Sequence, residues 1–128
     1  ISMDVKNKIF GRRCLKIVDG TKSTVLDPVV FARKMEKFGA GEIIINSIDR
    51  DGEMNGYDLK LIEEVSKAVT IPVVAAGGCK SMGDFTDAIN KSYASAVSAG
   101  SLFVYHGPRK AVLISYPTQS ELRKLFSE

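Results

Sequence analysis

Three carboxylates placed just after apolar runs are the first candidates for chemistry in this sequence. Asp4 lies near the end of the chain's first apolar run, and Asp49 and Asp51 closely follow the second. Burial of a carboxylate without a partner is costly and raises its pKa toward values useful in proton transfer, so Asp4 is a candidate general acid or base. An ion pair of Asp4 with Lys6 or Arg50 is the structural alternative. Asp49 and Asp51 fit acids that order a loop by accepting backbone N–H bonds better than they fit catalysts.

Two loops that contain glycine are candidates for binding a phosphate group. Gly77 and Gly78 follow one run of apolar and small residues, and Gly100 and Ser101 follow another. Glycine lets the backbone approach a ligand closely, and a helix that begins after Ser81 would direct backbone N–H groups toward an anion. Loops after the last two strands of an eight-stranded α/β barrel, with a short helix following, form the recurrent phosphate site of that fold. Together the two loops predict phosphate binding.

Other reactive side chains carry weaker signals. The lone His106 stands in a polar segment without the spacing of a Ser-His-Asp triad or of a metal site, so we expect a loop residue. Cys14 and Cys79 have neither a CxxC pattern nor a companion histidine, which argues against a disulfide and a metal site. We therefore expect no bound metal and no other cofactor.

Length and composition describe one ordinary domain. The chain has 128 residues, of which 45% are hydrophobic, enough for a sizeable core. The net charge is +3, and the basic cluster at 6–16 is sparser than a nucleic-acid surface requires. No run approaches the apolar length that spans a bilayer, and the N-terminus does not resemble a signal peptide. We expect a single domain over 1–128 in the cytoplasm, with no nucleic-acid or membrane partner.

Alternating strand and helix patterns must position these residues. Nearly continuous runs of apolar and small residues predict four strands that are covered on both faces, at 1–5, 42–47, 71–76 and 94–99, with a strand-like excursion at 14–20. Helix starts are predicted at Asp27 with Pro28, at Asp58, at Ser81 with Asp84, and at Thr118 with Glu121. The expected buried stripes are, in order, Phe31, Met35 and Phe38; Ile62, Val65 and Val69; Phe85, Ala88 and Ile89; and Leu122, Leu125 and Phe126.

Four βα units leave a parallel sheet with two open edges. We expect these edges at 1–5 and 94–99, which lack the prolines and lysines that discourage edge pairing. Two copies could close into a barrel of eight parallel strands. We therefore predict an α/β fold, the (βα)4 half of a TIM (βα)8 barrel, that closes by homodimerisation. A flavodoxin-like open sheet is the rival. A natural half-barrel and a fragment of a longer chain both stay open.

Four motifs occur in order along the chain: "DVK", "GAGEIIINSIDRDGEMNGYD", "IPVVAAGG" and "AVSAGSLF". In order and separation they resemble the C-terminal half of the cyclase subunit of imidazole glycerol phosphate synthase. The resemblance implies a barrel with a duplicated half. It also implies a cyclase of histidine biosynthesis that takes ammonia, channelled from a glutaminase partner. That cyclase converts a phosphoribulosyl formimino-aminoimidazole carboxamide ribotide into imidazole glycerol phosphate and an aminoimidazole ribotide.

The resemblance also implies roles for single residues. Asp4 matches the catalytic acid of the C-terminal half, and Asp51 matches a supporting acid in the loop after the next strand. Glu42 matches a charged residue near the ammonia entrance, at the opposite end of the barrel. The family's other catalytic aspartate lies in the N-terminal half. The candidates for binding the phosphate or the substrate are Lys6, Asn46, Gly77, Gly78, Gly100 and Ser101.

Three departures from the cyclase pattern keep alternatives open. Asn46 stands where the cyclase has Thr, Ala76 stands where it has Ser, and "YHGPRKAVLISYPTQSEL" replaces a shorter run. This tail is similar to that of paralogues associated with amidation of surface-polysaccharide sugars, in which an ammonia-delivering barrel works with a glutaminase. The candidate functions are therefore a cyclase-type half-barrel that binds a phosphosugar, an ammonia-delivering subunit for sugar amidation, and a non-catalytic phosphate-binding module.

Overall fold

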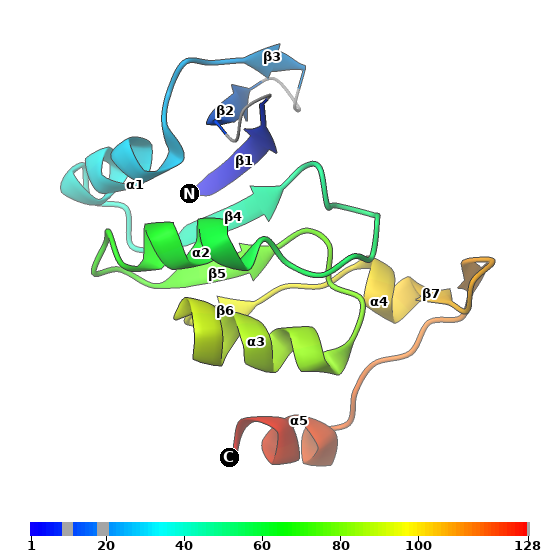
Figure 1. Ribbon diagram of the computed structural model, residues 1–128. Helices are drawn as coiled ribbons and strands as arrows, with labels where there is room; N and C mark the ends of the chain where they lie inside the picture. The colour runs from blue at the N-terminus through cyan, green and yellow to red at the C-terminus, as the bar shows by residue number, and fades with distance from the viewer. Residues whose placement is uncertain (9–11, 18–20, 128) are drawn as a thin grey trace.

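The computed structural model describes residues 1–8, 12–17 and 21–127 and places six strands in one sheet of order β3-β2-β1-β4-β5-β6 (Figure 1). The strands are β1 (Ser2–Asn7), β2 (Arg13–Ile17), β3 (Lys22–Ser23), β4 (Ile43–Ser47), β5 (Val73–Ala76) and β6 (Ala96–Val97), with a separate hairpin of β7 (Tyr105–His106) and β8 (Ala111–Val112). The helices are α1 (Pro28–Lys37), α2 (Leu59–Ser66), α3 (Met82–Ser92), α4 (Ser101–Val104) and α5 (Gln119–Phe126). The four expected strands are confirmed as β1, β4, β5 and β6. The excursion at 14–20 is confirmed as β2 up to Ile17, and residues 18–20 lie outside the described part.

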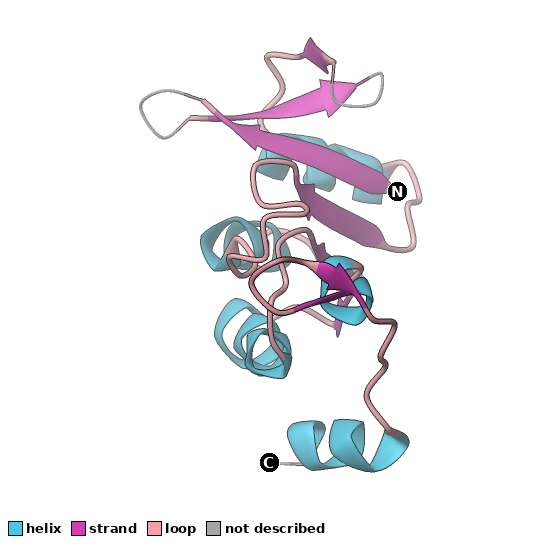
Figure 2. Ribbon diagram, turned by 90° about the vertical axis from the view of Figure 1, so that its right-hand side faces the viewer, coloured by secondary structure: helices cyan, strands magenta, loops and turns pink. Residues whose placement is uncertain are grey.

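Strands β1, β4, β5 and β6 run parallel, and one face of this sheet carries the core. Alternate residues of β1, β4 and β5 are buried because α1, α2 and α3 all pack on that face. Figure 2 shows α2 and α3 on the same side of the strands. The strand residues that form this face are Met3, Val5, Ile43, Ile45, Val73 and Ala75. The helix residues that meet them are Ala32, Leu61, Ile62, Val65, Phe85 and Ala88.

The opposite face of the sheet is left open by these three helices. Its side chains come from the alternate positions of the same strands, and most are half-buried: Asp4, Ile44, Asn46, Val74 and Ala76. In a (βα)8 barrel the helices form an outer ring and the other face of the sheet lines the interior, whereas a doubly wound sheet has helices on both faces. The one-sided sheet is therefore consistent with half of a barrel.

The expectation that residues 1–5 form an open edge is wrong for Asp4 and Val5. Strand β2 turns back and pairs antiparallel with β1, from Asp4 opposite Lys16 to Asn7 opposite Arg13, and β3 pairs with β2 in turn. The physical reason is that this hairpin packs the side chain of Leu15 into the core while it satisfies the backbone of β1. The other expected edge, β6, has β5 as its one strand neighbour in the described sheet.

Local signals for the helix starts are confirmed by hydrogen bonds. The carboxylate of Asp27 accepts the N–H groups of Val29 and Val30 at 2.9 and 3.0 Å, and α1 starts at Pro28. Asp58, Ser81 and Thr118 are the N-caps of α2, α3 and α5.

The expected buried stripe of α1 is only partly correct. Phe38 caps the C-terminal end of the helix and its side chain is 74% exposed, whereas Ala32 is fully buried. Phe31 and Met35 are half-buried at the flanks. The reason is that α1 approaches the sheet through its smallest side chain, so the larger ones lie beside the line of contact.

The C-terminal segment lies outside the main core. The expected stripe of α5 is only partly covered: Leu122 and Leu125 are half-buried, Phe126 is exposed, and Leu125 packs against the cluster around Phe85. The reason is that α5 meets α3 without a sheet beneath it, and an apolar cavity of about 610 Å³ separates α5 from β6. Within the described residues, no helix has both the length and the apolar character needed to cross a membrane.

Candidate functional site

Asp4 lies on the open face of the sheet and is held by a neighbouring strand. It stands beside Asn46 in the parallel register of β1 and β4, and Asn46 stands beside Ala76 of β5. The amide Nδ2 of Asn46 donates to Oδ1 of Asp4 at 3.1 Å. No ion pair joins Asp4 to Lys6 or Arg50, so the alternative of a structural salt bridge is wrong. The carboxylate is half-buried, oriented through one oxygen, and open to the face that would be the barrel interior.

A small depression at the carboxyl edge of the sheet gathers five of the predicted site residues. Asp51 comes from the loop after β4, Gly77 and Gly78 from the loop after β5, and Gly100 and Ser101 from the start of α4. The depression has a volume of about 20 Å³ and its other lining residues are Gly52, Met54, Cys79, Ser98 and Ala99. Three loops that are far apart in the sequence therefore meet at one point.

The two central glycines are required by close approach of the backbone. Gly77 has φ +82°, and a Cβ there would stand 2.6 Å from Oδ1 of Asn46 and 2.8 Å from the carbonyl oxygen of Ser47. Gly78 has φ +100°, and a Cβ there would stand 2.5 Å from the carbonyl oxygen of Gly56. These conformations and distances exclude a side chain at both positions without strain. The loop after β5 is thus locked against the loop after β4.

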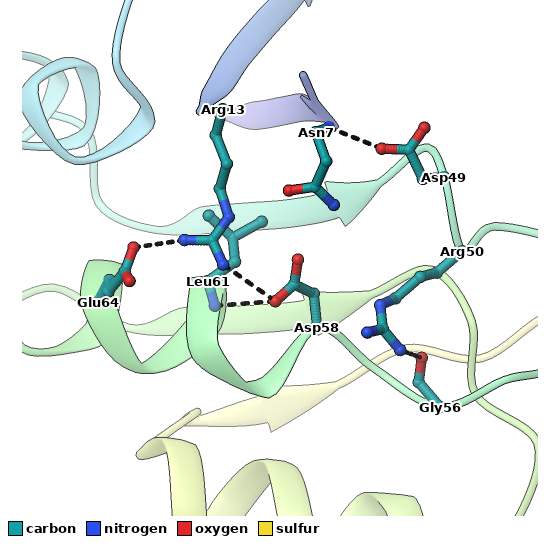
Figure 3. Close-up of polar contacts among 8 residues, drawn as sticks. All are labelled: Asn7, Arg13, Asp49, Arg50, Gly56, Asp58, Leu61 and Glu64. Carbon is teal, nitrogen blue, oxygen red and sulfur yellow. Dashed lines mark hydrogen bonds and ion pairs between the residues drawn. The ribbon is translucent and has the colours of Figure 1, made fainter. Parts of the chain in front are cut away.

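Arg50 stabilises the loop that carries Asp51 through a hydrogen bond. Its guanidinium Nη1 donates to the carbonyl oxygen of Gly56 at 3.1 Å, and the N–H of Gly56 donates to the carbonyl oxygen of Gly78 at 2.7 Å (Figure 3 shows the Arg50 bond). At the start of the same loop, the N–H of Asp51 donates to the carbonyl oxygen of Ser47 at 2.9 Å. Asp51 therefore sits in a loop with its shape set by backbone bonds, and its own side chain is exposed.

A buried tyrosine that sequence reasoning missed bonds to one of the residues that line the depression. The phenol of Tyr57 donates to the carbonyl oxygen of Ser98 at 2.8 Å and so joins the loops after β4 and β6. Burial, together with the neighbouring thiol of Cys79, raises the pKa of this phenol far above its ordinary value. Burial likewise raises the pKa of the Cys79 thiol. Both groups are therefore neutral near pH 7. A signal was present, because a buried tyrosine needs a partner for its hydroxyl.

A second set of contacts holds the β1–β2 hairpin against the rest of the domain (Figure 3). The guanidinium of Arg13 bonds Asp58 at 3.3 Å and also pairs with Glu64. The N–H of Asn7 donates to Oδ2 of Asp49 at 2.6 Å, which confirms Asp49 as an acid that orders a loop. Sequence reasoning did not predict the role of Arg13, because its partners are on a helix far along the chain.

Besides Asp4 and Asn46, two further predicted site residues lie away from the depression. Lys6 is exposed on β1, on the same face as Asp4 and two residues nearer the carboxyl end of the strand. Glu42 precedes β4 at the amino edge of the sheet, where its carbonyl oxygen accepts the chain's N-terminal amine at 2.7 Å. Glu42 is therefore at the opposite end of the strands from Asp51 and the glycines.

The N-terminal end of α3 carries a carboxylate of its own. Asp84 in the first turn accepts the N–H groups of Lys80 and Ser81, which precede the helix, at 2.9 and 3.0 Å. His106 is exposed in the β7–β8 hairpin, and Cys14 and Cys79 are both buried as free thiols. In the described ranges no group of three or more His, Cys, Asp or Glu side chains is arranged to hold a metal ion.

Comparison with known proteins places this sheet and its loops in a family. Residues 1–108 match the family model described as "Histidine biosynthesis protein". The chain belongs to this family. A Pseudomonas aeruginosa protein named "Putative imidazole glycerol phosphate synthase subunit hisF2" is 42% identical over 121 residues, which are 94% of this chain and 48% of that protein. The imidazole glycerol phosphate synthase subunit HisF of Alkaliphilus metalliredigens is 45% identical over 106 residues, 83% of this chain and 42% of that protein.

The HisF-like resemblance inferred from the four motifs is thus confirmed. The chain spans about half the length of the curated relatives it matches. The match to the family model ends at residue 108, inside the turn between β7 and β8. The second strand of that hairpin and all of α5 therefore lie beyond the part that the family model describes.

Proposed function

We propose that this chain is a HisF-type half-barrel that binds a phosphosugar at the carboxyl edge of its sheet and takes part in ammonia-dependent cyclase chemistry. One observation carries the proposal: Asp51 and both glycine loops meet in one depression, and Asp4 is held on the open face of the same strands. The depression would then bind the phosphate group at one end of the substrate, while the carboxylate of Asp4 transfers a proton at another part of it.

Asp4 is the proposed general acid or base. Because Asn46 engages Oδ1, the carboxylate is oriented while Oδ2 stays available to take a proton from the substrate or return one to it. Asp51 is the proposed supporting acid, held in place by the bond from its own N–H to the carbonyl oxygen of Ser47.

The phosphate is proposed to bind through the backbones of Gly78, Gly100 and Ser101. These residues line the depression and carry small side chains or none, so a phosphate oxygen can come within hydrogen-bond distance of backbone N–H groups. A depression of about 20 Å³ fits part of a phosphate group, with the sugar extending over the open face toward Asp4.

A complete site is proposed to require a second set of four strands. The open face exposes half-buried side chains that a barrel interior would cover, and the edge at β6 has a partner on one side only. A second copy of the chain, or an N-terminal half on the same polypeptide, would supply the missing strands. The β1–β2 pairing leaves Ser2 and Met3 as the part of the outer β1 edge outside that ladder, so closure would engage this stretch or displace the hairpin.

Ammonia is proposed to enter from the amino edge of the sheet, delivered by a glutaminase partner. Glu42 lies at that edge, at the opposite end of the strands from the phosphate loops. The half-buried side chains between Glu42 and Asp4 on the open face would form one side of the path.

The test measures turnover of the cyclase substrate with ammonium salt as the nitrogen source, in wild type, Asp4→Asn and Asp87→Asn. Asp87 is a matched control because its carboxylate pairs with Lys91 on the outer surface of α3. We expect Asp4→Asn to reduce turnover by a factor of about 10² to 10⁴, as for loss of a general acid or base, and Asp87→Asn to have no effect. Turnover retained in Asp4→Asn would refute the assigned role.

Binding without turnover would support the non-catalytic module instead. A titration with ribose 5-phosphate separates these cases, because absence of binding by wild type would refute both readings. Sedimentation over a dilution series tests closure: a persistent monomer would refute the homodimer.

A second candidate function is delivery of ammonia for amidation of a polysaccharide sugar. The observation that favours it is the β7–β8 hairpin with its extended tail, which forms a separate two-stranded unit in place of a short run into the last helix. If this reading holds, a glutaminase and an amidotransferase that bind this chain would transfer nitrogen from glutamine to a sugar acid. The cyclase substrate would then remain unchanged under the same conditions.

A further inference from the structure

The β7–β8 hairpin directly follows the helix that forms one wall of the proposed phosphate depression. Helix α4, which begins with Ser101 at the depression, runs straight into β7. The returning strand is bonded to α4, since the N–H of Leu113 donates to the carbonyl oxygen of Val104 at 2.9 Å and that of Ser115 donates to Phe103 at 2.8 Å. In Figure 1, α4 and β7 lie on the side toward which β4 and β5 point. The hairpin therefore stands at the carboxyl edge of the sheet.

Aromatic contacts anchor the root of this hairpin to the domain. The ring centroids of Phe103 and Tyr116 are 5.1 Å apart, and Phe103 meets Phe85 of α3 edge-on at 6.3 Å. Such pairs stabilise a packing arrangement beyond the area they bury. The hairpin is thus attached at its base and is placed by the same helix that forms one wall of the depression.

The tip of the hairpin reaches the opposite wall. The amine Nζ of Lys110 donates to the carbonyl oxygen of Gly52 at 3.0 Å, across 58 positions of sequence. Gly52 lines the depression next to Asp51, on the loop after β4. The hairpin therefore bridges the two outer walls, and the bridging group is a cation at the rim of the depression.

The charge of the depression makes this cation significant. Among its lining residues Asp51 is the one charged side chain, and Cys79 is held as a neutral thiol by burial. A phosphate dianion placed there would meet backbone N–H groups and a carboxylate, with no basic side chain in the wall itself. Lys110 places a cation at the rim, on the loop that carries Asp51, where it would lessen the repulsion between that carboxylate and a phosphate.

We propose that the β7–β8 hairpin is a cationic cap on the phosphate site, in which Lys110 contacts the phosphate of a sugar phosphate monoester and makes binding selective for a dianion. This inference rests on the proposed function, because it assigns a further binding residue to the same depression. A lysine amine has three protons, so the bond to Gly52 leaves others for phosphate oxygens. The cap is carried by a segment that extends past residue 108, where the match to the family model ends.

The test is an isothermal calorimetric titration of the 128-residue chain with inorganic phosphate. It compares wild type with Lys110→Gln, Lys110→Arg and Lys37→Gln. The amide of Lys110→Gln keeps a donor for Gly52 but loses the charge, and Lys110→Arg keeps both. Lys37 is a matched control, an exposed lysine in the last turn of α1. We expect Lys110→Gln to weaken phosphate binding about tenfold, the lower end for loss of a charge-assisted hydrogen bond. Lys110→Arg and Lys37→Gln should bind as wild type does.

Salt dependence separates loss of charge from displacement of the hairpin. If Lys110 contacts the phosphate, wild-type affinity falls with added sodium chloride more steeply than the affinity of Lys110→Gln, because screening acts on the charge that the variant lacks. If Lys110→Gln binds phosphate more weakly than wild type by the same factor at every salt concentration, the cap is refuted. The cap is also refuted if Lys110→Gln binds phosphate as tightly as wild type, although the phosphate site itself would then stand. Absence of phosphate binding in every variant, wild type included, would overturn both the site and the cap.

Discussion

Replacement of Gly78 by alanine is the sharpest test of how the phosphate loops are held together. The new methyl group would stand 2.5 Å from the carbonyl oxygen of Gly56 and 2.8 Å from Cβ of Arg50. Both neighbours are close to the backbone and cannot rotate away. The residue also has φ +100°, a conformation that alanine adopts at a cost. The substitution therefore combines strain in the backbone with a steric clash.

The size of the effect follows from these two contributions. An alanine at positive φ costs about 1–2 kcal/mol, and overpacking against fixed neighbours costs about 1–3 kcal/mol more. We expect Gly78→Ala to lower the free energy of unfolding by about 2–5 kcal/mol, a large share of the roughly 5–15 kcal/mol that stabilises a typical domain. The depression should also be distorted, because the bond from Gly56 to Gly78 would lengthen.

Gly39→Ala is the matched control. Gly39 has φ +91°, and a Cβ there would have no neighbour within 4 Å, so it carries the backbone strain without the clash. Urea unfolding followed by circular dichroism suits a chain with no tryptophan. We expect Gly39→Ala to cost about 1–2 kcal/mol, so the two variants should differ by about 1–3 kcal/mol. Equal destabilisation would show that the loops around Gly78 relax freely, and would refute the close packing argued here.

Three further predictions concern contacts outside the depression. Arg13→Met should lower the free energy of unfolding by about 2–4 kcal/mol, because it leaves the buried carboxylate of Asp58 without its cation; urea unfolding measures this. Tyr57→Phe should cost about 1 kcal/mol in the same assay, since it removes one buried hydrogen bond. The hydrogen bonds from Thr70 lower the pKa of Glu36 below its ordinary 4.5, so this carboxylate stabilises the fold above that pH and its contribution is lost as the pH falls through the lowered value. Glu36→Gln should therefore flatten the fall in thermal midpoint below about pH 4.5, measured by calorimetry.

Each of these predictions has an internal control. Arg12→Met removes an exposed neighbour of Arg13, and a loss equal to that of Arg13→Met would contradict the ion-pair argument. Tyr105→Phe removes a hydroxyl from the exposed hairpin and should leave stability unchanged. Glu53→Gln changes an exposed acid, so its acid unfolding should follow wild type; a flattened curve there would show that net charge, rather than the Thr70 bonds, sets the pH dependence.

Local structure was predictable because its causes are local. Asp27 caps α1 through bonds to N–H groups two and three residues away, and Asp58 caps α2 in the same way. The apolar runs predicted the four parallel strands, because the open face of the sheet, which α1, α2 and α3 leave uncovered, also carries apolar side chains such as Ile44, Val74 and Ala76. The stripe of α1 was less predictable, since the choice between Phe38 and Ala32 depends on how closely the helix approaches the sheet.

In the candidate site, too, the local features could be predicted from the sequence and the long-range contacts could not. That small and acidic residues follow each strand was visible in the sequence, and parallel strands bring such ends to one edge. The contact of Lys110 with Gly52 and that of Tyr57 with Ser98 were not visible, because each joins loops with no local pattern in common. The contacts of Arg13 with Asp58 and Glu64 could not be predicted for the same reason.

The amino-acid sequence by itself determined the order of strands and helices, the helix starts, and the glycines at the strand ends, since backbone propensity and short-range hydrogen bonds act within a few residues. Tertiary structure alone decided that β2 covers the edge of β1, that Asn46 orients Asp4, and that the β7–β8 hairpin bridges the depression. Those outcomes depend on which surfaces meet when the sheet twists and the helices pack, and such long-range geometry leaves no periodic trace in the chain.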